Sequence, residues 1–161
     1  MMRYFAYLIV FPFLISCNTG NNSISYNDTI IEPQLEVITK LDSIYAGPEV
    51  SVEDIKKHRI ELVKEINEAM DEIRNLKDFK GNTAFKETAM KYFSHLNFLY
   101  GKTNNIDSLI YNINSPERAE KMKPEDFELM DRETQKYLEL EEALLAEQKK
   151  FAEQFNMRLE Y

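Results

Sequence analysis

"PEDFELMDRETQKYLELEEALLAEQKKFAEQFNMRLEY", residues 124–161, is the longest uninterrupted helical pattern in the chain. It contains no glycine, and its one proline stands at the first position, where a helix tolerates proline. Apolar side chains recur at seven-residue intervals in two neighbouring rows: Tyr137, Leu144 and Phe151 in the first, and Leu138, Leu145, Ala152 and Leu159 in the second. This period is typical of antiparallel bundles and coiled coils. We therefore expect a helix that begins at Pro116 or at Pro124 and continues to the end of the chain, spanning roughly 50 Å at 1.5 Å per residue.

Upstream, three glycines follow apolar periodic segments and predict where helices end. These are Gly47, Gly81 and Gly101, since glycine readily adopts the left-handed conformation that closes a helix. The segment before Gly47 predicts a short helix that begins near Pro33. Its expected inward residues are Leu35, Ile38, Leu41, Ile44 and Tyr45.

Two longer helices are predicted between these glycines. The first begins at Ser51, whose hydroxyl can cap the helix with Asp54 three residues on. The second begins after Asn82 or Thr83. The expected inward residues of the first are Ile55, Leu62, Ile66, Ala69, Met70, Ile73 and Leu76, and those of the second are Phe85, Ala89, Tyr92, Phe93, Leu96, Leu99 and Tyr100.

The composition agrees with a helical fold and limits the partners. Only four glycines and five prolines occur in 161 residues, which favours long helices over strands and turns. The segment Ile106–Ile113 fits a two-turn helix or a strand, because β-branched residues suit both. We expect an all-α antiparallel bundle of three long helices plus one or two short ones. The net charge of −8 argues against phosphate backbones, so no nucleic-acid partner is expected.

The N-terminus has the pattern of an export signal. Arg3 precedes the apolar run Tyr4–Ile15, which is too short to span a bilayer. Cys17 follows this run directly and is the only cysteine, which excludes a disulfide within the chain. The segment Asn18–Asn27 is small and polar, and it predicts a flexible tether.

The tetrapeptide Leu14-Ile15-Ser16-Cys17 resembles the lipobox of bacterial lipoproteins. The resemblance implies that residues 1–16 are a cleaved signal peptide, that Cys17 carries palmitate-type acyl chains, and that residues 17–29 tether a domain at 30–161. Acyl chains of this kind anchor a protein to a membrane. Because asparagine and not aspartate follows Cys17, the outer membrane is expected, with its periplasmic or surface face left open.

Two further segments, "FKGNTAFKETAMKYFSHLNFLY" and "KKFAEQFNMRLEY", are similar in plan to those of small helical surface lipoproteins found in several bacterial groups. The resemblance implies no activity and no site residues.

The chain lacks the patterns that catalysis or a bundle metal centre would need. Helical di-iron sites use Glu-x-x-His pairs, but Ile55 and Tyr92 stand three residues before His58 and His95. A metal at His58 with its neighbours Asp54 and Glu61 is the alternative to a solvated polar face. No G-x-S-x-G sequence or glycine-rich phosphate loop occurs. We expect no catalytic residue, metal or cofactor, and a non-enzymatic binding or structural role; a small-molecule or metal-binding bundle is the alternative.

A partner surface is expected at the C-terminal end, if any part of the last helix extends beyond its neighbours. Phe151, Phe155, Leu159 and Tyr161 continue the apolar row to the end of the chain. They form a docking patch for another envelope protein if they are exposed. The alternative, which we favour, is that an upstream helix or Ile106–Ile113 covers them.

Overall fold

The computed structural model describes the backbone of residues 19–159 and the side chains of residues 22–159. The expected signal peptide, the expected lipid attachment at Cys17 and the expected contact residue Tyr161 lie outside the described residues. Within them the chain forms six α-helices and no sheet, so the all-α fold is confirmed. The helices are α1 (Thr19–Ile44), α2 (Val52–Asn75), α3 (Ala84–Lys102), α4 (Ile106–Ile113), α5 (Pro116–Ala119) and α6 (Pro124–Gln154).

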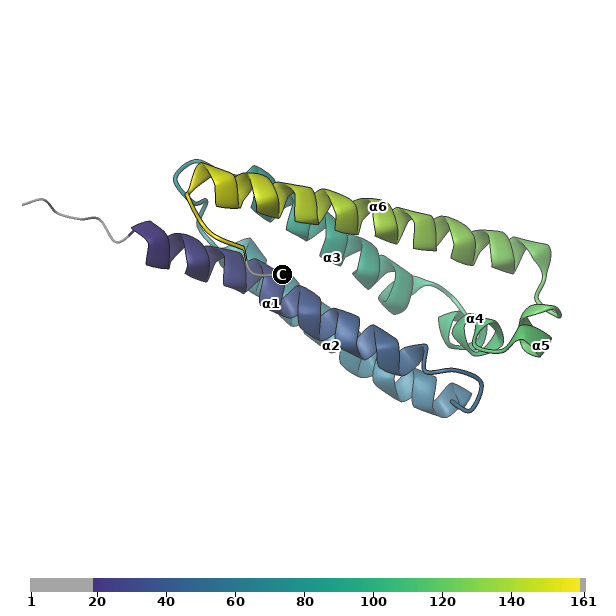
Figure 1. The fold of residues 1–161 in the computed structure, drawn as a ribbon. Coiled ribbons are helices and arrows are strands. Elements are labelled where there is room, and N and C mark those ends of the chain that lie inside the picture. Colours follow the sequence, from purple (N-terminus) through teal and green to yellow (C-terminus); the bar gives the residue numbers. More distant parts are fainter. Residues whose placement is uncertain (1–18, 160–161) are drawn as a thin grey trace, which may run out of the picture.

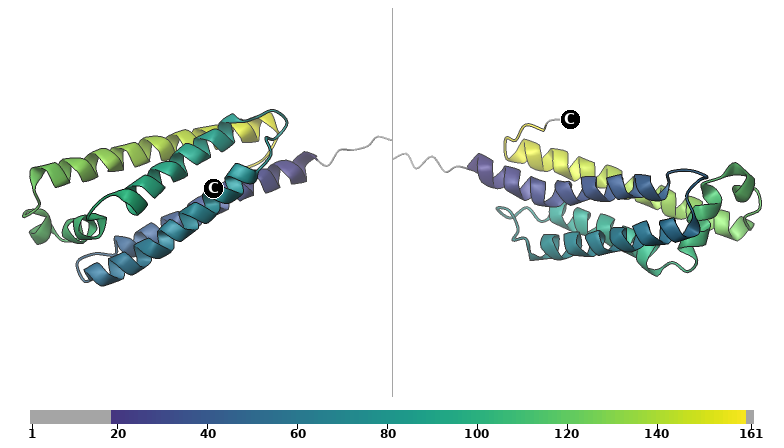
Figure 2. Two further views of the ribbon diagram at one scale, coloured as in Figure 1. Left: turned by 180° about the vertical axis from the view of Figure 1, so that it is seen from behind. Right: turned by 90° about the horizontal axis from the view of Figure 1, so that it is seen from below.

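The four long helices form an up-down-up-down antiparallel bundle. α1 packs along α2, α2 along α3, and α3 along α6 (Figure 1). The view from behind shows the same two layers, with α3 beside α6 and α2 beside α1 (Figure 2). Over the described part of the chain no comparably close approach joins α1 to α6, and the two ribbons diverge toward the end of the bundle that carries α4 and α5.

The first helix differs most from the expectation. α1 begins at Thr19 and passes through Pro33, so the predicted start near Pro33 is wrong, and so is the flexible tether over residues 19–29. The bundle therefore has four long helices where three were expected. Of the five residues predicted to face inward here, Ile44 is buried, Ile38 and Leu41 are partly buried, and Leu35 and Tyr45 are exposed, Leu35 at 59%. The buried row of α1 includes Ser23, Tyr26, Ile30, Val37 and Ile44.

Contacts with the rest of the bundle explain why this polar segment is helical. Tyr26 stacks on Phe151 of α6 with ring centroids 5.2 Å apart. Lys40 forms ion pairs with Glu65 at 3.0 Å and Glu61 at 3.7 Å on α2. Tertiary packing of this kind outweighs the weak helix propensity of asparagine and serine and the hydrogen bond lost at an internal proline.

α2 and α3 match the sequence prediction closely. The Ser51 hydroxyl accepts the Asp54 N–H at 3.1 Å and donates to the Asp54 carboxylate at 2.6 Å, which confirms the cap. All seven residues predicted to face inward on α3 are buried. On α2, five of the seven are buried and the remaining two, Met70 and Leu76, are partly buried against the core.

Of the three glycines predicted to end helices, Gly47 follows the end of α1 closely. The prediction for Gly81 is wrong, because α2 ends at Asn75 with Leu76 as its C-cap and Gly81 lies in the loop beyond. Gly47 and Gly81 have φ values of +109° and +83°, in the region that favours glycine. Gly101 lies inside α3, so the prediction that it ends the helix is wrong. The left-handed turn after α3 is made by Asn105, with φ +58°, directly before α4.

The segment Ile106–Ile113 is a helix, which settles the choice that the sequence left open. Side chains fasten α4 and its C-cap to the neighbouring long helices. Arg59 of α2 binds both carboxylate oxygens of Asp107, at 2.5 and 3.1 Å, and donates to the Tyr100 carbonyl oxygen at 3.0 Å. Asn114 donates to the carbonyl oxygen of Ile44 at the end of α1, at 3.0 Å.

α6 begins at Pro124 and ends earlier than predicted, at Gln154. Asn156 has φ +53°, its N–H donates to the Glu153 carbonyl oxygen, and the Met157 N–H donates to the Ala152 carbonyl oxygen at 2.8 Å. This is a Schellman motif with asparagine in the position usually taken by glycine. No helix in the described part of the chain is both long and apolar enough to cross a membrane.

Candidate binding groove

The expected C-terminal patch is an internal aromatic cluster. Phe151 is fully buried, with its ring centroid 5.3 Å from that of Phe85 and 5.5 Å from that of Phe79. Phe155 is half-buried and packs edge-on against Phe79 at 4.8 Å. The exposed-patch interpretation is therefore wrong for Phe151 and Phe155, because α1 and the loop after α2 cover them. Leu159 is half-buried.

The first of the two predicted rows on α6 faces the core, and the second does so only at its C-terminal end, where Ala152 is buried. Leu144 and Phe151 of the first row are buried and Tyr137 is partly buried, whereas Leu138 and Leu145 of the second row are exposed. A seven-residue repeat allows either row to face a neighbour, and here the position of α3 decides which one is covered. Leu145 is thus left beside the open side of the bundle.

A long groove follows the seam between α1 and α6. Its larger part has a volume of about 740 Å³. The aliphatic side chains Ile24, Leu35 and Leu145 stand on its walls, and they are 48%, 59% and 48% exposed. The other apolar lining residues are Ile31, Ile38, Met157 and Leu159. An exposed strip of large apolar side chains along one seam is the usual mark of an interaction surface.

The charged residues on this larger part of the groove are mostly acidic. Asp28 and Glu32 stand on α1 and Glu141 on α6, whereas Arg158 is the only base among the lining residues that the structure describes. Over residues 22–159 none of these three carboxylates forms an ion pair with lysine or arginine. The groove therefore presents apolar walls with a negative edge.

Polar side chains cross the seam at its base. Gln148 of α6 donates to the Asn27 side-chain oxygen of α1 at 2.9 Å, and both residues are buried. Gln34 is buried close to the Tyr92 hydroxyl, whose pKa is raised by burial and then by Tyr137. The Asn27–Gln148 hydrogen bond holds α1 against α6, and Gln34 places α1 against Tyr92 of α3, without filling the groove above them.

A smaller hollow lies at the other end of the seam, where α1 and α6 diverge. Its volume is about 290 Å³. Three tyrosines line it, and the hydroxyls of Tyr45 and Tyr100 are 3.1 Å apart. The Tyr137 hydroxyl donates to Glu141 at 2.8 Å. Burial, followed by this hydrogen bond, raises the pKa of Tyr137 to about 12. Burial also raises the pKa of Tyr45 and, more strongly, of Tyr100.

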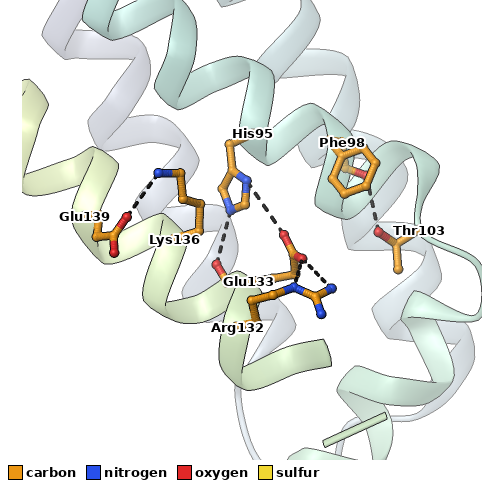
Figure 3. A network of polar contacts seen from close by, with 7 residues as sticks. All are labelled: His95, Phe98, Thr103, Arg132, Glu133, Lys136 and Glu139. Atoms are coloured by element: carbon orange, nitrogen blue, oxygen red, sulfur yellow. Dashed lines mark hydrogen bonds and ion pairs between the residues drawn. The ribbon is translucent and has the colours of Figure 1, made fainter. Parts of the chain in front are cut away.

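The histidines lie away from this groove. His95 of α3 points toward α6, where its Nε2 is 3.1 Å from the Glu133 carbonyl oxygen and its Nδ1 is 3.9 Å from the Glu133 carboxylate (Figure 3). Arg132 binds the same carboxylate at 3.0 Å. This network ties α3 to α6. No group of three His, Cys, Asp or Glu side chains within the described residues could hold a metal ion, and that includes His58 with Asp54 and Glu61.

The groove could not be predicted while residues 17–29 were assigned to a tether, because its α1 wall begins in that segment. The spacing of Tyr26, Ile30, Val37 and Ile44, by four, seven and seven, is the signal that could have placed the start of α1. A search for similar proteins finds no matching family model, no similar curated protein and no similar solved structure.

Proposed function

We propose that the protein is a lipid-anchored, non-enzymatic binding protein of the bacterial cell envelope, and that the α1–α6 groove takes up an amphipathic helix of another envelope protein. The anchoring half of the proposal is supported by the lipobox-like residues Leu14 to Cys17. The binding half is supported by one observation above all. Leu35 of α1 and Leu145 of α6 line the groove between these two helices, and both are exposed.

A helix is the occupant that suits the shape of this surface. A bundle helix is normally covered by a neighbour on each side, and α1 and α6 each lack that neighbour along the seam. Apolar anchors at helical spacing on a partner could insert between the aliphatic walls. Charge complementarity selects a helix with basic flanks, because Asp28, Glu32 and Glu141 edge the groove.

The anchoring half can be tested at Cys17. Replacing Cys17 with alanine removes the thiol that would accept the diacylglyceryl group, so we expect no incorporation of labelled palmitate and no removal of residues 1–16. The measurement is palmitate labelling of cells followed by mass spectrometry of the N-terminus. Equal labelling of the Cys17→Ala variant would contradict the proposal.

The binding half can be tested with a photo-crosslinking amino acid in the native envelope. Placed at Leu35 and, separately, at Leu145, the crosslinker should capture the same partner protein. Mass spectrometry should map both crosslinks to a single basic amphipathic helix, and a synthetic peptide of that helix should bind the purified protein. The control position is Ile60 on α2, which is 56% exposed but lies outside the groove. Identical capture from Ile60, or a crosslinked segment that is acidic or extended, would contradict the proposal.

A further inference from the structure

We propose that the hollow among Tyr45, Tyr100 and Tyr137 is a binding site for a small organic cation, an ammonium group carried on an apolar body. The site lies beyond the larger part of the groove and has its own lining residues; of the residues named there, only Ile38 is shared. It can therefore be correct or wrong independently of the proposed partner helix.

The apolar part of the ligand would occupy the aliphatic walls of the hollow. Ile38 and Leu41 come from α1, Leu99 from α3 and Ile113 from α4, so three helices contribute aliphatic side chains to this space. A volume of about 290 Å³ is near the lower limit of ligand pockets, which span roughly 300 to 1,000 Å³. The hollow thus suits a small molecule better than a peptide.

The aromatic rings give the hollow its preference for positive charge. A tyrosine ring face carries a partial negative charge and attracts ammonium groups, and several such rings around one space form the aromatic cages that recognise quaternary ammonium ligands. Tyr45 comes from the C-terminal end of α1, Tyr100 from α3 and Tyr137 from α6. Three tyrosines from three segments therefore line one space.

A carboxylate adds full charge to this cage. Asp42 of α1 lines the hollow, and its charge together with that of Glu141 acts on the Tyr137 hydroxyl. No lysine or arginine is among the lining residues. The nearby Lys40 is engaged on the other side of α1 by Glu61 and Glu65 of α2. Asp42 therefore attracts a cationic ligand and repels an anionic one, and it adds nothing for a neutral ligand.

Calorimetric titration of the full chain in a non-ionic detergent tests the proposal. The probes are hexyltrimethylammonium, hexanol and hexanoate, which share a six-carbon chain and differ in charge. We expect saturable binding of the cation, at least about tenfold weaker binding of hexanol, and no binding of hexanoate, because the cage and Asp42 act only on positive charge. Equal binding of cation and alcohol, or no saturable binding of the cation to the folded protein, would overturn the proposal.

Matched variants locate the site. Asp42→Asn should weaken binding of hexyltrimethylammonium about two- to fivefold, the upper part of the range for one exposed charge pair. Glu36→Gln, an equally exposed carboxylate on α1 outside this hollow, should leave binding unchanged. Tyr137→Leu should abolish binding, with circular dichroism used to verify that the variant is folded. Equal effects of Asp42→Asn and Glu36→Gln would overturn the assignment.

A further double variant separates the two proposals. Leu35→Ser with Leu145→Ser removes the partner surface and should leave cation binding intact, because neither residue lines the hollow. Loss of cation binding in this folded variant would contradict a separate site.

Discussion

Leu144 and Leu145 are adjacent in the chain and lie in opposite environments. Leu144 is fully buried between α6 and the rest of the bundle, whereas Leu145 is 48% exposed on the wall of the groove. The sequence places both in seven-residue rows that are typical of bundle packing. Neither residue type nor spacing separates them, because the distinction depends on which side of α6 the neighbouring helices occupy.

This contrast gives a direct prediction. Leu144→Ala should lower the free energy of unfolding by about 2 to 5 kcal/mol, as truncation of a buried leucine does. Leu145→Ala, the same change one residue later, should cost less than about 1 kcal/mol, and Glu142→Ala on the exposed side should stay within about 0.5 kcal/mol. Urea denaturation measures all three. Similar losses at positions 144 and 145 would mean that both rows are covered.

Arg59 is the second residue whose environment the sequence does not reveal. It joins α2 to both α3 and α4, and its side chain and that of Asp107 are mostly shielded from solvent. Arg59→Ala should therefore lower the free energy of unfolding by about 2 to 3 kcal/mol, since a charge-assisted pair and a carbonyl contact are lost together. Arg74→Ala removes an exposed pair with Asp71 and should cost under about 1 kcal/mol. Equal costs in chemical denaturation would show that the Arg59 network adds no stability.

At the scale of helices, α2 and α3 could be predicted because their inward rows are continuous and apolar. The start of α1 was missed, because polar residues interrupt the inward row and make its apolar spacing hard to see. Ser23, Asn27 and Gln34 are buried there, and Asn27 is compensated by a hydrogen bond from Gln148, 121 residues away in sequence. A partner at that distance is not visible in the local pattern. The end of α6 was missed for a different reason. Asn156 takes the position of the glycine that usually indicates a Schellman motif.

The early start of α1 has a measurable consequence. Ile30 is fully buried. Ile30→Ala should lower the free energy of unfolding by about 2 to 5 kcal/mol, because it opens a cavity against the bundle. The control is Leu35→Ala on the same helix, which is exposed and should cost under about 1 kcal/mol. If Ile30→Ala leaves the melting temperature and the free energy of unfolding in urea unchanged, the segment before Pro33 is not part of the packed domain.

For the molecule as a whole, tyrosines with shielded hydroxyls make the stability sensitive to alkali. Tyr45 belongs with them, because its hydroxyl lies 3.1 Å from that of Tyr100 although its side chain is partly exposed. Burial, with Asp78 as the second cause, raises the pKa of Tyr26 to about 12, and burial with Glu141 does the same for Tyr137. Tyr45, Tyr92 and Tyr100 have raised pKa values for the same main reason.

The direction of the pH effect follows from proton linkage. In the unfolded chain a tyrosine loses its proton near pH 10, while the folded protein keeps it to higher pH, so the stabilisation is complete below about pH 10. It should be lost progressively as the pH rises from about 10 through 12. Urea unfolding across this range, together with phenolate absorbance, measures both quantities. Constant stability with full tyrosine ionisation would contradict the burial of these hydroxyls.

On our proposal, the α1–α6 groove serves binding and adds little to the stability of the bundle. The most direct measurement is the free energy of unfolding of the double variant Leu35→Ser with Leu145→Ser, made alongside crosslinking from Ile24 in the same groove. We predict a loss of at most about 1 kcal/mol, as for two exposed positions, together with loss of the partner crosslink. A loss of several kcal/mol, or an unchanged crosslink in a stable variant, would contradict the claim.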